Sequence, residues 1–195
     1  MIEAPIYGLV LAGGVSSRMG ENKAELIYHD RPQWAYCAQL IGPYCREVYF
    51  SVNESVQMQD VSQDYLVYDS MSDRGPASGI LAAMQRYPEA AWMIMPVDMP
   101  GVDRALINRL FRQRDPSANA TCLSRGGKVE PLLGVWEPGM AAELQSYLDR
   151  GKSSLPQFLA DRNVHQIELN DLHAHKLDSV DTPEERSNFL KFGRK

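Results

Sequence analysis

The sequence predicts an α/β protein of three layers, with helices on both faces of a mostly parallel sheet. Short runs of strand-forming residues alternate along the chain with segments of helical spacing, which is the pattern of consecutive βαβ units. The first run, Ile6–Leu11, is short and continuous and is closed by Gly13 and Gly14. Such a run is typical of a strand buried on both faces, as in a parallel sheet.

The first half of the chain is the more regular part. Pro32 suits the first turn of a helix that we expect to reach about Tyr44. A second helix is expected over residues 76–87, where apolar residues recur at helical spacing and Pro88 ends the pattern. Further strands, rich in β-forming residues, are predicted at residues 47–52, 65–68 and 92–95.

The second half continues the same architecture less regularly. The arginine-rich residues 104–114 are interpreted as the solvated face of a helix. The last helix begins at Thr182, because Thr-Pro-Glu-Glu is a capping box with proline at the first helical position. Strands are predicted at residues 120–123, 132–136 and 166–169, and a helix at residues 140–150. No repeat or linker interrupts the chain, so a single domain over residues 1–195 is expected.

Composition and charge argue against several classes of function. The formal net charge is -5, whereas a protein that binds nucleic acid usually carries a basic surface. No apolar run approaches the roughly 20 residues that span a bilayer, and the N-terminal residues lack the basic start of a signal peptide. The three cysteines show no CxxC spacing and indicate reduced thiols. We therefore expect a cytoplasmic protein with neither a nucleic acid nor a membrane as partner.

The chemistry begins in one loop, LVLAGGVSSRMGENKAEL, residues 9–26. Glycines let backbone N–H groups approach an anion, and Arg18 and Lys23 add the charge that a polyphosphate needs. The dinucleotide pattern GxGxxG is absent, and Glu21 stands where the Walker A pattern requires lysine. The loop is therefore interpreted as a phosphate loop of a third kind.

Polar residues at other strand ends are expected to meet this loop. Asp98, in PVDMP, follows a buried strand, and Mg²⁺ bound with phosphates needs only one or two carboxylates. Asp69 and Asn53 follow two further strands. The small residues 75–79, GPASG, open a helix whose N-terminus would allow a ligand to lie close. Because ligands of open α/β sheets bind beyond the carboxyl ends of the strands, we expect one crevice there.

These motifs give the chain a close resemblance to a known family. LAGGVSSRMGENK, GPASG, PVDMP, EPLLGVW and DTPEE resemble, in order and spacing, the molybdenum cofactor guanylyltransferase family of the nucleotidyltransferase superfamily. The resemblance runs from residue 9 to about residue 189 and implies a GT-A, Rossmann-like nucleotidyltransferase fold. It also implies Mg²⁺-dependent transfer of GMP from GTP to the phosphate of molybdopterin, with release of pyrophosphate. Molybdoenzymes and other cofactor-biosynthesis proteins are candidate partners.

The resemblance also assigns roles to residues of this chain. Arg18 falls where the loop meets the triphosphate, and Asp98 would bind Mg²⁺ as well as GTP. Arg18, Lys23 and Asp98 are the catalytic candidates, because they supply or hold positive charge at the reacting phosphates. The positions implied to contact GTP are Leu11, Ala12, Gly13, Lys23, Asn53, Asp69 and Asp98.

The chain departs from the family pattern at two places. Val15 follows the double glycine, where the family often has a polar or basic residue, and Val180-Asp181 stands where the family usually has asparagine. Asp181 is open to three readings: a second Mg²⁺ ligand, a group facing the pterin, or an acidic neighbour of the helix cap. Glu130, in EPLLGVW, is expected near the acceptor.

Two other functions stay open from the residues alone. One is a cytidylyltransferase or a sugar-phosphate nucleotidyltransferase of the same superfamily, because base choice depends on backbone contacts. The other is a non-catalytic nucleotide-binding module, against which the presence of Arg18, Lys23 and Asp98 argues.

Overall fold

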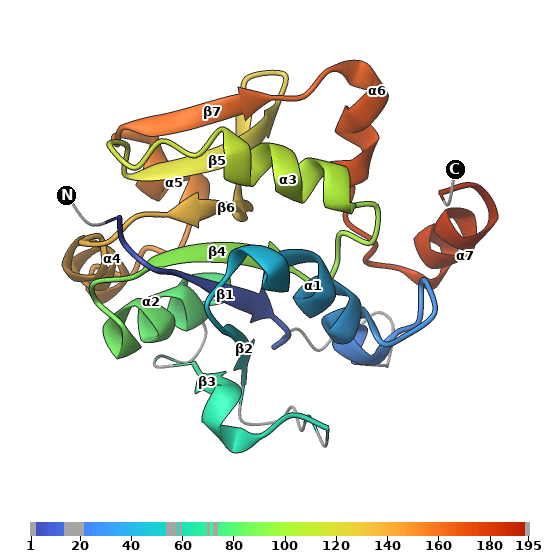
Figure 1. Ribbon diagram of the computed structural model, residues 1–195, viewed down its shortest axis with the longest axis horizontal. Helices are drawn as coiled ribbons and strands as arrows, with labels where there is room; N and C mark the ends of the chain where they lie inside the picture. Colours follow the sequence, from blue (N-terminus) through green and yellow to red (C-terminus); the bar gives the residue numbers. More distant parts are fainter. Residues whose placement is uncertain are drawn as a thin grey trace.

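The computed structural model describes residues 3–13, 22–53, 58, 60–69, 71 and 74–193, apart from the side chain of Leu172. Within these residues seven strands form one sheet, in the order β3-β2-β1-β4-β6-β5-β7 (Figure 1). The strands are β1 (Ile6–Leu11), β2 (Val48–Val52), β3 (Leu66–Tyr68), β4 (Ala91–Pro96), β5 (Ala120–Arg125), β6 (Lys128–Trp136) and β7 (Val164–Glu168). The helices are α1 (Gln33–Ile41), α2 (Pro76–Arg86), α3 (Arg104–Arg112), α4 (Ala141–Asp149), α5 (Leu155–Ala160), α6 (Asp171–Ala174) and α7 (Pro183–Phe192).

The sheet is mostly parallel, as predicted. β1 pairs in parallel with both β2 and β4, β2 with β3, and β5 with β7. Only β6 among these strands runs the other way, antiparallel to β4 and β5. The carboxyl ends of β1, β2, β3 and β4 therefore meet at one edge of the sheet.

Two apolar cores make the three layers. Successive residues of β1 point to opposite faces, so Val10 packs with α1 and α3 while Leu9 packs with α2, α4 and α5. Trp92 of β4 and Trp136 of β6 are fully buried in the second core. The fold is the three-layer arrangement that the sequence predicts, because every central strand is covered on both faces.

The last helix lies apart from these layers. Figure 1 shows α7 at the end of the molecule opposite α4. Phe189 of α7 packs edge-on against Tyr28, with ring centroids 5.6 Å apart, in a small cluster that includes Leu26 and Val180. The capping box at Thr182 is present, with Glu185 completing it, as predicted.

Several boundaries differ from the prediction. α1 ends at Ile41, and a 3₁₀ turn, Gly42–Tyr44, replaces its last predicted residues. β6 begins at Lys128, four residues before the predicted start at residue 132. The prediction missed these residues because Pro131 interrupts the strand pattern, near the point where the register with β5 shifts. Helices α5 and α6 were not predicted. In the part of the chain that the structure describes, no helix has the length and apolar character of a membrane span.

The arginine-rich segment is only partly solvated. α3 buries Leu106, Ile107 and Leu110 and exposes Arg104 and Arg112, as expected of an amphipathic helix. Arg114 lies beyond the helix, however, and its side chain is only 5% exposed. The guanidinium forms a bidentate ion pair with Glu137, and this pairing allows its charge to be buried.

Candidate functional site

The ends of β1 and β2 build the first wall of the site. The Nδ2 of Asn53 donates a hydrogen bond to the carbonyl oxygen of Gly13 at 2.7 Å, and the backbone N–H of Ala12 donates to Ser51 at 2.9 Å. A Cβ on Gly13 would lie 3.1 Å from the backbone nitrogen of Asn53, so the backbone segments that follow β1 and β2 approach each other closely. The predicted nucleotide residues Leu11, Ala12, Gly13 and Asn53 thus lie side by side, and Ala12 is fully buried among them.

Asp69 extends this wall from the end of β3. Its backbone N–H donates to Val52 at 3.2 Å, and the Oγ of Ser51 donates to its Oδ1 at 3.2 Å. Burial raises the pKa of the Asp69 carboxyl, and the hydrogen bond from Ser51 opposes that rise in part. Ser51 was not singled out in the sequence, because a single serine inside a strand carries no pattern.

The GPASG segment has a packing role at this wall. A Cβ on Gly79 would lie 2.0 Å from the Oγ of Ser51 and 3.0 Å from the Oδ1 of Asp69. The missing side chain of Gly79 therefore makes room for these two residues, and brings α2 against the end of β2. Gly75, the residue before α2, has a φ of 58°, a conformation that glycine adopts without strain.

Lys23 brings positive charge to the same edge. It opens a short 3₁₀ turn, Lys23–Glu25, capped by Asn22, whose side chain accepts a hydrogen bond from the backbone N–H of Ala24 at 3.0 Å. The Nζ of Lys23 lies 4.0 Å from the Oδ2 of Asp98 and forms a closer ion pair with Asp181. The sequence predicted Lys23 and Asp98 as neighbours and left Asp181 open. The structure brings all three together.

Asp98 is the most confined acid of the site. Its Oδ1 is buried and has no hydrogen-bond partner among the described residues. Burial raises the pKa of the Asp98 carboxyl; the charge of Lys23 opposes this rise and the charge of Asp181 adds to it. An anionic oxygen in such a place is stabilised by a cation.

A divalent cation fits this carboxylate. Among the described residues no three His, Cys, Asp or Glu side chains gather into a metal cage. A cation that also binds nucleotide phosphates needs no such cage, because Mg²⁺ retains water and takes one or two protein carboxylates. The buried Oδ1 of Asp98 supplies the first of these, and Asp181 forms an ion pair with the same lysine that lies near Asp98.

The middle of the glycine-rich loop, residues 14–21, lies outside the described residues. Arg18, the third catalytic candidate, is one of them, and so is Val15. The described ends of the loop, Gly13 and Lys23, both lie at the carboxyl edge of the sheet. The role of Arg18 therefore stays a prediction from the sequence.

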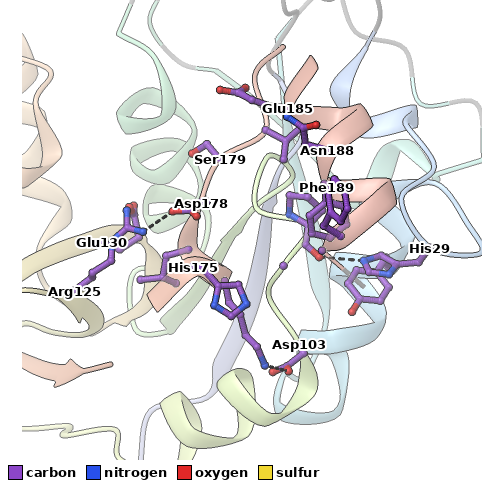
Figure 2. Close-up of a pocket in the computed structure, with 18 of the residues that line it drawn as sticks. His29, Asp103, Arg125, Glu130, His175, Asp178, Ser179, Glu185, Asn188 and Phe189 are labelled. Carbon is purple, nitrogen blue, oxygen red and sulfur yellow. Dashed lines mark hydrogen bonds and ion pairs between the residues drawn. The ribbon is translucent and has the colours of Figure 1, made fainter. Parts of the chain in front are cut away.

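A cavity of about 1180 Å³ is lined by residues near Asp98, although Asp98 itself is not part of its lining. Pro100 and Val180 line it, and the backbone N–H of Val180 donates to the carbonyl oxygen of Asp98 at 2.7 Å. Figure 2 shows Arg125 paired with Asp178 on one side and His29 facing Phe189 on the other.

Glu130, predicted near the acceptor, lines the same cavity. Its Oε1 accepts a hydrogen bond from the backbone N–H of Leu132 at 3.2 Å. Burial raises the pKa of the Glu130 carboxyl, and the charge of Asp98 adds to that rise.

Comparison with known sequences gives the same assignment as the residues. The MobA-like NTP transferase domain family matches residues 8–167. Over 140 residues, 70% of this chain, the sequence is 36% identical to the molybdenum cofactor biosynthesis bifunctional protein of Synechocystis, of whose length the match spans 40%. It is 26% identical to the molybdenum cofactor guanylyltransferase of Shewanella piezotolerans, over 93% of this chain and 90% of that one.

The fold has close counterparts among solved structures. The molybdopterin-guanine dinucleotide biosynthesis protein A of Archaeoglobus fulgidus superposes with a TM-score of 0.77, over 95% of this chain and 97% of that one, at 21% identity. This similarity confirms the predicted nucleotidyltransferase fold. With the sequence match over residues 8–167, it follows that the chain belongs to the MobA-like NTP transferase domain family.

Proposed function

We propose that this protein transfers GMP from GTP to the phosphate of molybdopterin, releasing pyrophosphate, in a reaction that uses Mg²⁺. Membership of the MobA-like family and the names of its relatives, molybdenum cofactor guanylyltransferase among them, support the reaction class. The structural observation that carries the proposal is the position of Lys23 beside Asp98, at the strand ends that also hold Gly13, Asn53 and Asp69.

The chemistry needs positive charge more than a covalent catalyst. Attack of one phosphate on another brings anions together, so rate comes from positioning and from charge that neutralises the reacting oxygens. Lys23 supplies such a charge at the edge of the sheet. A bound divalent cation, proposed to be Mg²⁺, would add charge at the triphosphate, with Asp98 as its protein ligand.

The remaining residues position the nucleotide. Backbone groups of Leu11 and Gly13 would lie along it, since Gly13 has no side chain, and the fully buried Ala12 between them would hold their backbone in place. Asn53 holds the backbone of Gly13 by its hydrogen bond, and Asp69 offers a carboxylate at the neighbouring strand end. The cavity beside Asp98, with Glu130 in its lining, is the proposed place of the acceptor. The unbroken sheet from β3 to β7 supports the proposal that the described residues act as one domain.

The test is pyrophosphate release with purified protein, Mg²⁺ and molybdopterin, each of GTP, CTP, ATP and UTP being added separately. We expect release with GTP alone. Release with CTP alone would assign the protein to cytidylyl transfer, and release with none of the four would overturn catalysis in favour of a binding module.

A binding measurement complements this assay. A ligand at a hundred times its dissociation constant stabilises a protein by about 2.7 kcal/mol, which for this length raises Tm by roughly 5–10 °C. We expect a rise of that size with GTP and Mg²⁺ together. A larger rise with another nucleotide would contradict the proposed base selectivity.

A further inference from the structure

Lys23 lies where a bound cation is expected. Its ammonium group stands between two carboxylates, 4.0 Å from the Oδ2 of Asp98 and in a closer ion pair with Asp181. The lysine side chain is only 13% exposed, whereas the side chains of Asp98 and Asp181 are 29% and 47% exposed. The two acids come from distant parts of the chain, the end of β4 and the segment that precedes α7.

Lysine leaves part of this position unsatisfied. The Oδ2 of Asp98 is too far from the Nζ for a hydrogen bond, and its Oδ1 is buried without a partner among the described residues. The carboxylate of Asp98 thus has oxygen atoms that the ammonium group does not use. A divalent cation takes several oxygen ligands at short distance, so it would bind more of these oxygen atoms than lysine does.

The backbone that carries Asp181 is fixed independently of Lys23. The N–H of Val180 donates to the carbonyl oxygen of Asp98 at 2.7 Å. The Oε2 of Glu185 accepts hydrogen bonds from the N–H groups of Asp181 and Thr182 at 2.8 and 2.9 Å. Asp181 therefore keeps its place when the lysine moves, while the lysine itself has a flexible four-carbon stem.

We propose that Lys23 is a stand-in for the divalent cation in the nucleotide-free protein, and that Asp98 and Asp181 hold whichever of the two is present. The inference rests on the proposed function, since it concerns the same site. Two cations cannot share the place between these carboxylates, because they repel each other at such short range. A bound triphosphate would remove the conflict, because its negative charges would attract Lys23 and leave Asp98 and Asp181 free to hold the metal.

The consequence is a protein that binds metal poorly until nucleotide is present. It also gives a role to Asp181, for which the sequence left three readings open. A carboxylate holds an ammonium group more strongly than an amide does. Asp181 therefore strengthens the stand-in contact as well as the metal site.

The test is to measure Mn²⁺ binding to the nucleotide-free protein. The electron paramagnetic resonance signal of free Mn²⁺ reports how much metal is bound. Lys23→Met removes the competing charge, and we expect it to bind Mn²⁺ on the order of tenfold more tightly than wild type. Lys23→Met combined with Asp181→Asn should lose that gain. Lys23→Gln serves as a second variant, and unchanged thermal unfolding verifies that each protein is folded.

The chain offers a matched control for the change in charge. Lys176 forms an ion pair with Asp103, also partly buried, and Lys176→Met removes the same charge from the whole protein. We expect no gain in Mn²⁺ affinity there. The proposal is overturned if Lys23→Met and Lys23→Gln gain nothing over wild type, if Lys176→Met gains as much, or if the double variant keeps the gain.

This measurement is separate from the test of the reaction. Mn²⁺ binding without nucleotide requires no turnover, so it can support the stand-in role whichever base the enzyme uses. Absence of pyrophosphate release by wild type overturns the proposed function alone. A gain in Mn²⁺ affinity at Lys23→Met together with normal release by wild type is the result expected when both proposals hold.

Discussion

Lys23 and Asp181 form an ion pair although 158 residues separate them in the chain. Lys23 lies inside the region matched by the MobA-like family and Asp181 lies beyond its end at residue 167. With the hydrogen bond from Val180 to Asp98, this pair joins the segment before α7 to the carboxyl edge of the sheet. The C-terminal segment is therefore part of the candidate site and not an appendage to it.

The carboxylate of Asp98 gives the most direct prediction for activity. Asp98→Asn keeps the shape of the side chain and removes its charge, so the metal loses its proposed protein ligand. We expect nucleotidyl transfer to fall by roughly 10²–10³-fold, the typical loss of one preorganised electrostatic contact. The pyrophosphate assay with GTP measures it.

Stability should not fall with activity in this variant. Burial already disfavours the charged form of Asp98, so the neutral amide removes a desolvation cost. Asp115→Asn is the matched control: Asp115 does not line the proposed acceptor cavity, and its Oδ1 accepts hydrogen bonds from the backbone N–H and the Oγ of Ser117. We expect that control to retain transfer. Wild-type turnover in Asp98→Asn would remove Asp98 from the mechanism.

The close approach at Gly79 gives a prediction about packing. Gly79→Ala places a Cβ 2.0 Å from the Oγ of Ser51, and overpacking of this kind costs about 1–3 kcal/mol despite the better helix propensity of alanine. We expect a lower urea midpoint and, because Asp69 lies 3.0 Å away, weaker GTP binding as well. Adding Ser51→Gly should restore part of the stability.

A second glycine tests whether space is the reason. A Cβ on Gly42 would meet its nearest neighbour, Val48, at 4.0 Å, and the backbone there is already helical. Gly42→Ala should change the free energy of unfolding by no more than about 0.5 kcal/mol. Equal losses at Gly42 and Gly79 would contradict the packing account.

The contrast between Gly79 and Asp98 shows what the sequence predicts and what it does not. Asp98, Asp69 and Asn53 were predictable at one edge of the sheet, because each lies within two residues of the end of a parallel strand. The role of Gly79 was not, because the clash partner Ser51 lies on another element and has no local signal.

The same reasoning explains the rest of the fold. The central strands were predictable because they are short apolar runs buried on both faces. The pairing of Lys23 with Asp181 depends on the path of the chain between β7 and α7, a stretch with no hydrophobic period. The only sequence signal that pointed to this pairing was Asp181 itself, the acid before the cap at Thr182. Helix α6 has four residues, too few for a periodic pattern to appear.

The buried ion pair of Arg114 and Glu137 gives a prediction about stability. Both side chains are nearly inaccessible, 5% and 6% exposed, and the guanidinium donates to both carboxylate oxygens at 2.6 and 2.7 Å. Arg114→Met leaves Glu137 charged and buried without this partner, which typically costs about 3–5 kcal/mol. Urea denaturation measures it, and Arg114→Met with Glu137→Met should cost less than the single change.

An exposed pair provides the comparison for this prediction. Arg31 pairs with Asp30 at 2.7 Å, but the two side chains are 38% and 71% exposed. Surface pairs contribute little to stability, because water screens the two charges, so Arg31→Met should scarcely move the urea midpoint. A loss at Arg114 as small as that at Arg31 would mean that the buried pair contributes nothing beyond an exposed one.

The three cysteines give a prediction for how stability changes with pH in the alkaline range. Burial raises the pKa of the Cys45 and Cys122 thiols to about 12 and raises that of Cys37 as well. In the unfolded chain a thiol titrates near 8.5, so from about pH 8.5 upward the unfolded state loses protons that the folded state keeps. The contribution of the buried thiols to the free energy of unfolding is therefore fully present below pH 8.5. It is lost as the pH rises toward 12, by about 2 kcal/mol per thiol at pH 10.

Urea midpoints between pH 7.5 and 9, where tyrosines of the unfolded chain are still almost fully protonated, measure the first part of this decline. Cys45→Ala should show a shallower decline than wild type, because one of the titrating thiols is gone. The slope is the informative quantity, since the smaller side chain beside Gly8 also lowers stability at every pH. A thiol reagent at pH 8 gives an independent measure: we expect all three cysteines to be protected in the folded protein and to react once it is unfolded. Equal slopes for wild type and Cys45→Ala, or rapid reaction of the folded protein, would show that the thiols ionise as freely in the folded protein as in solution.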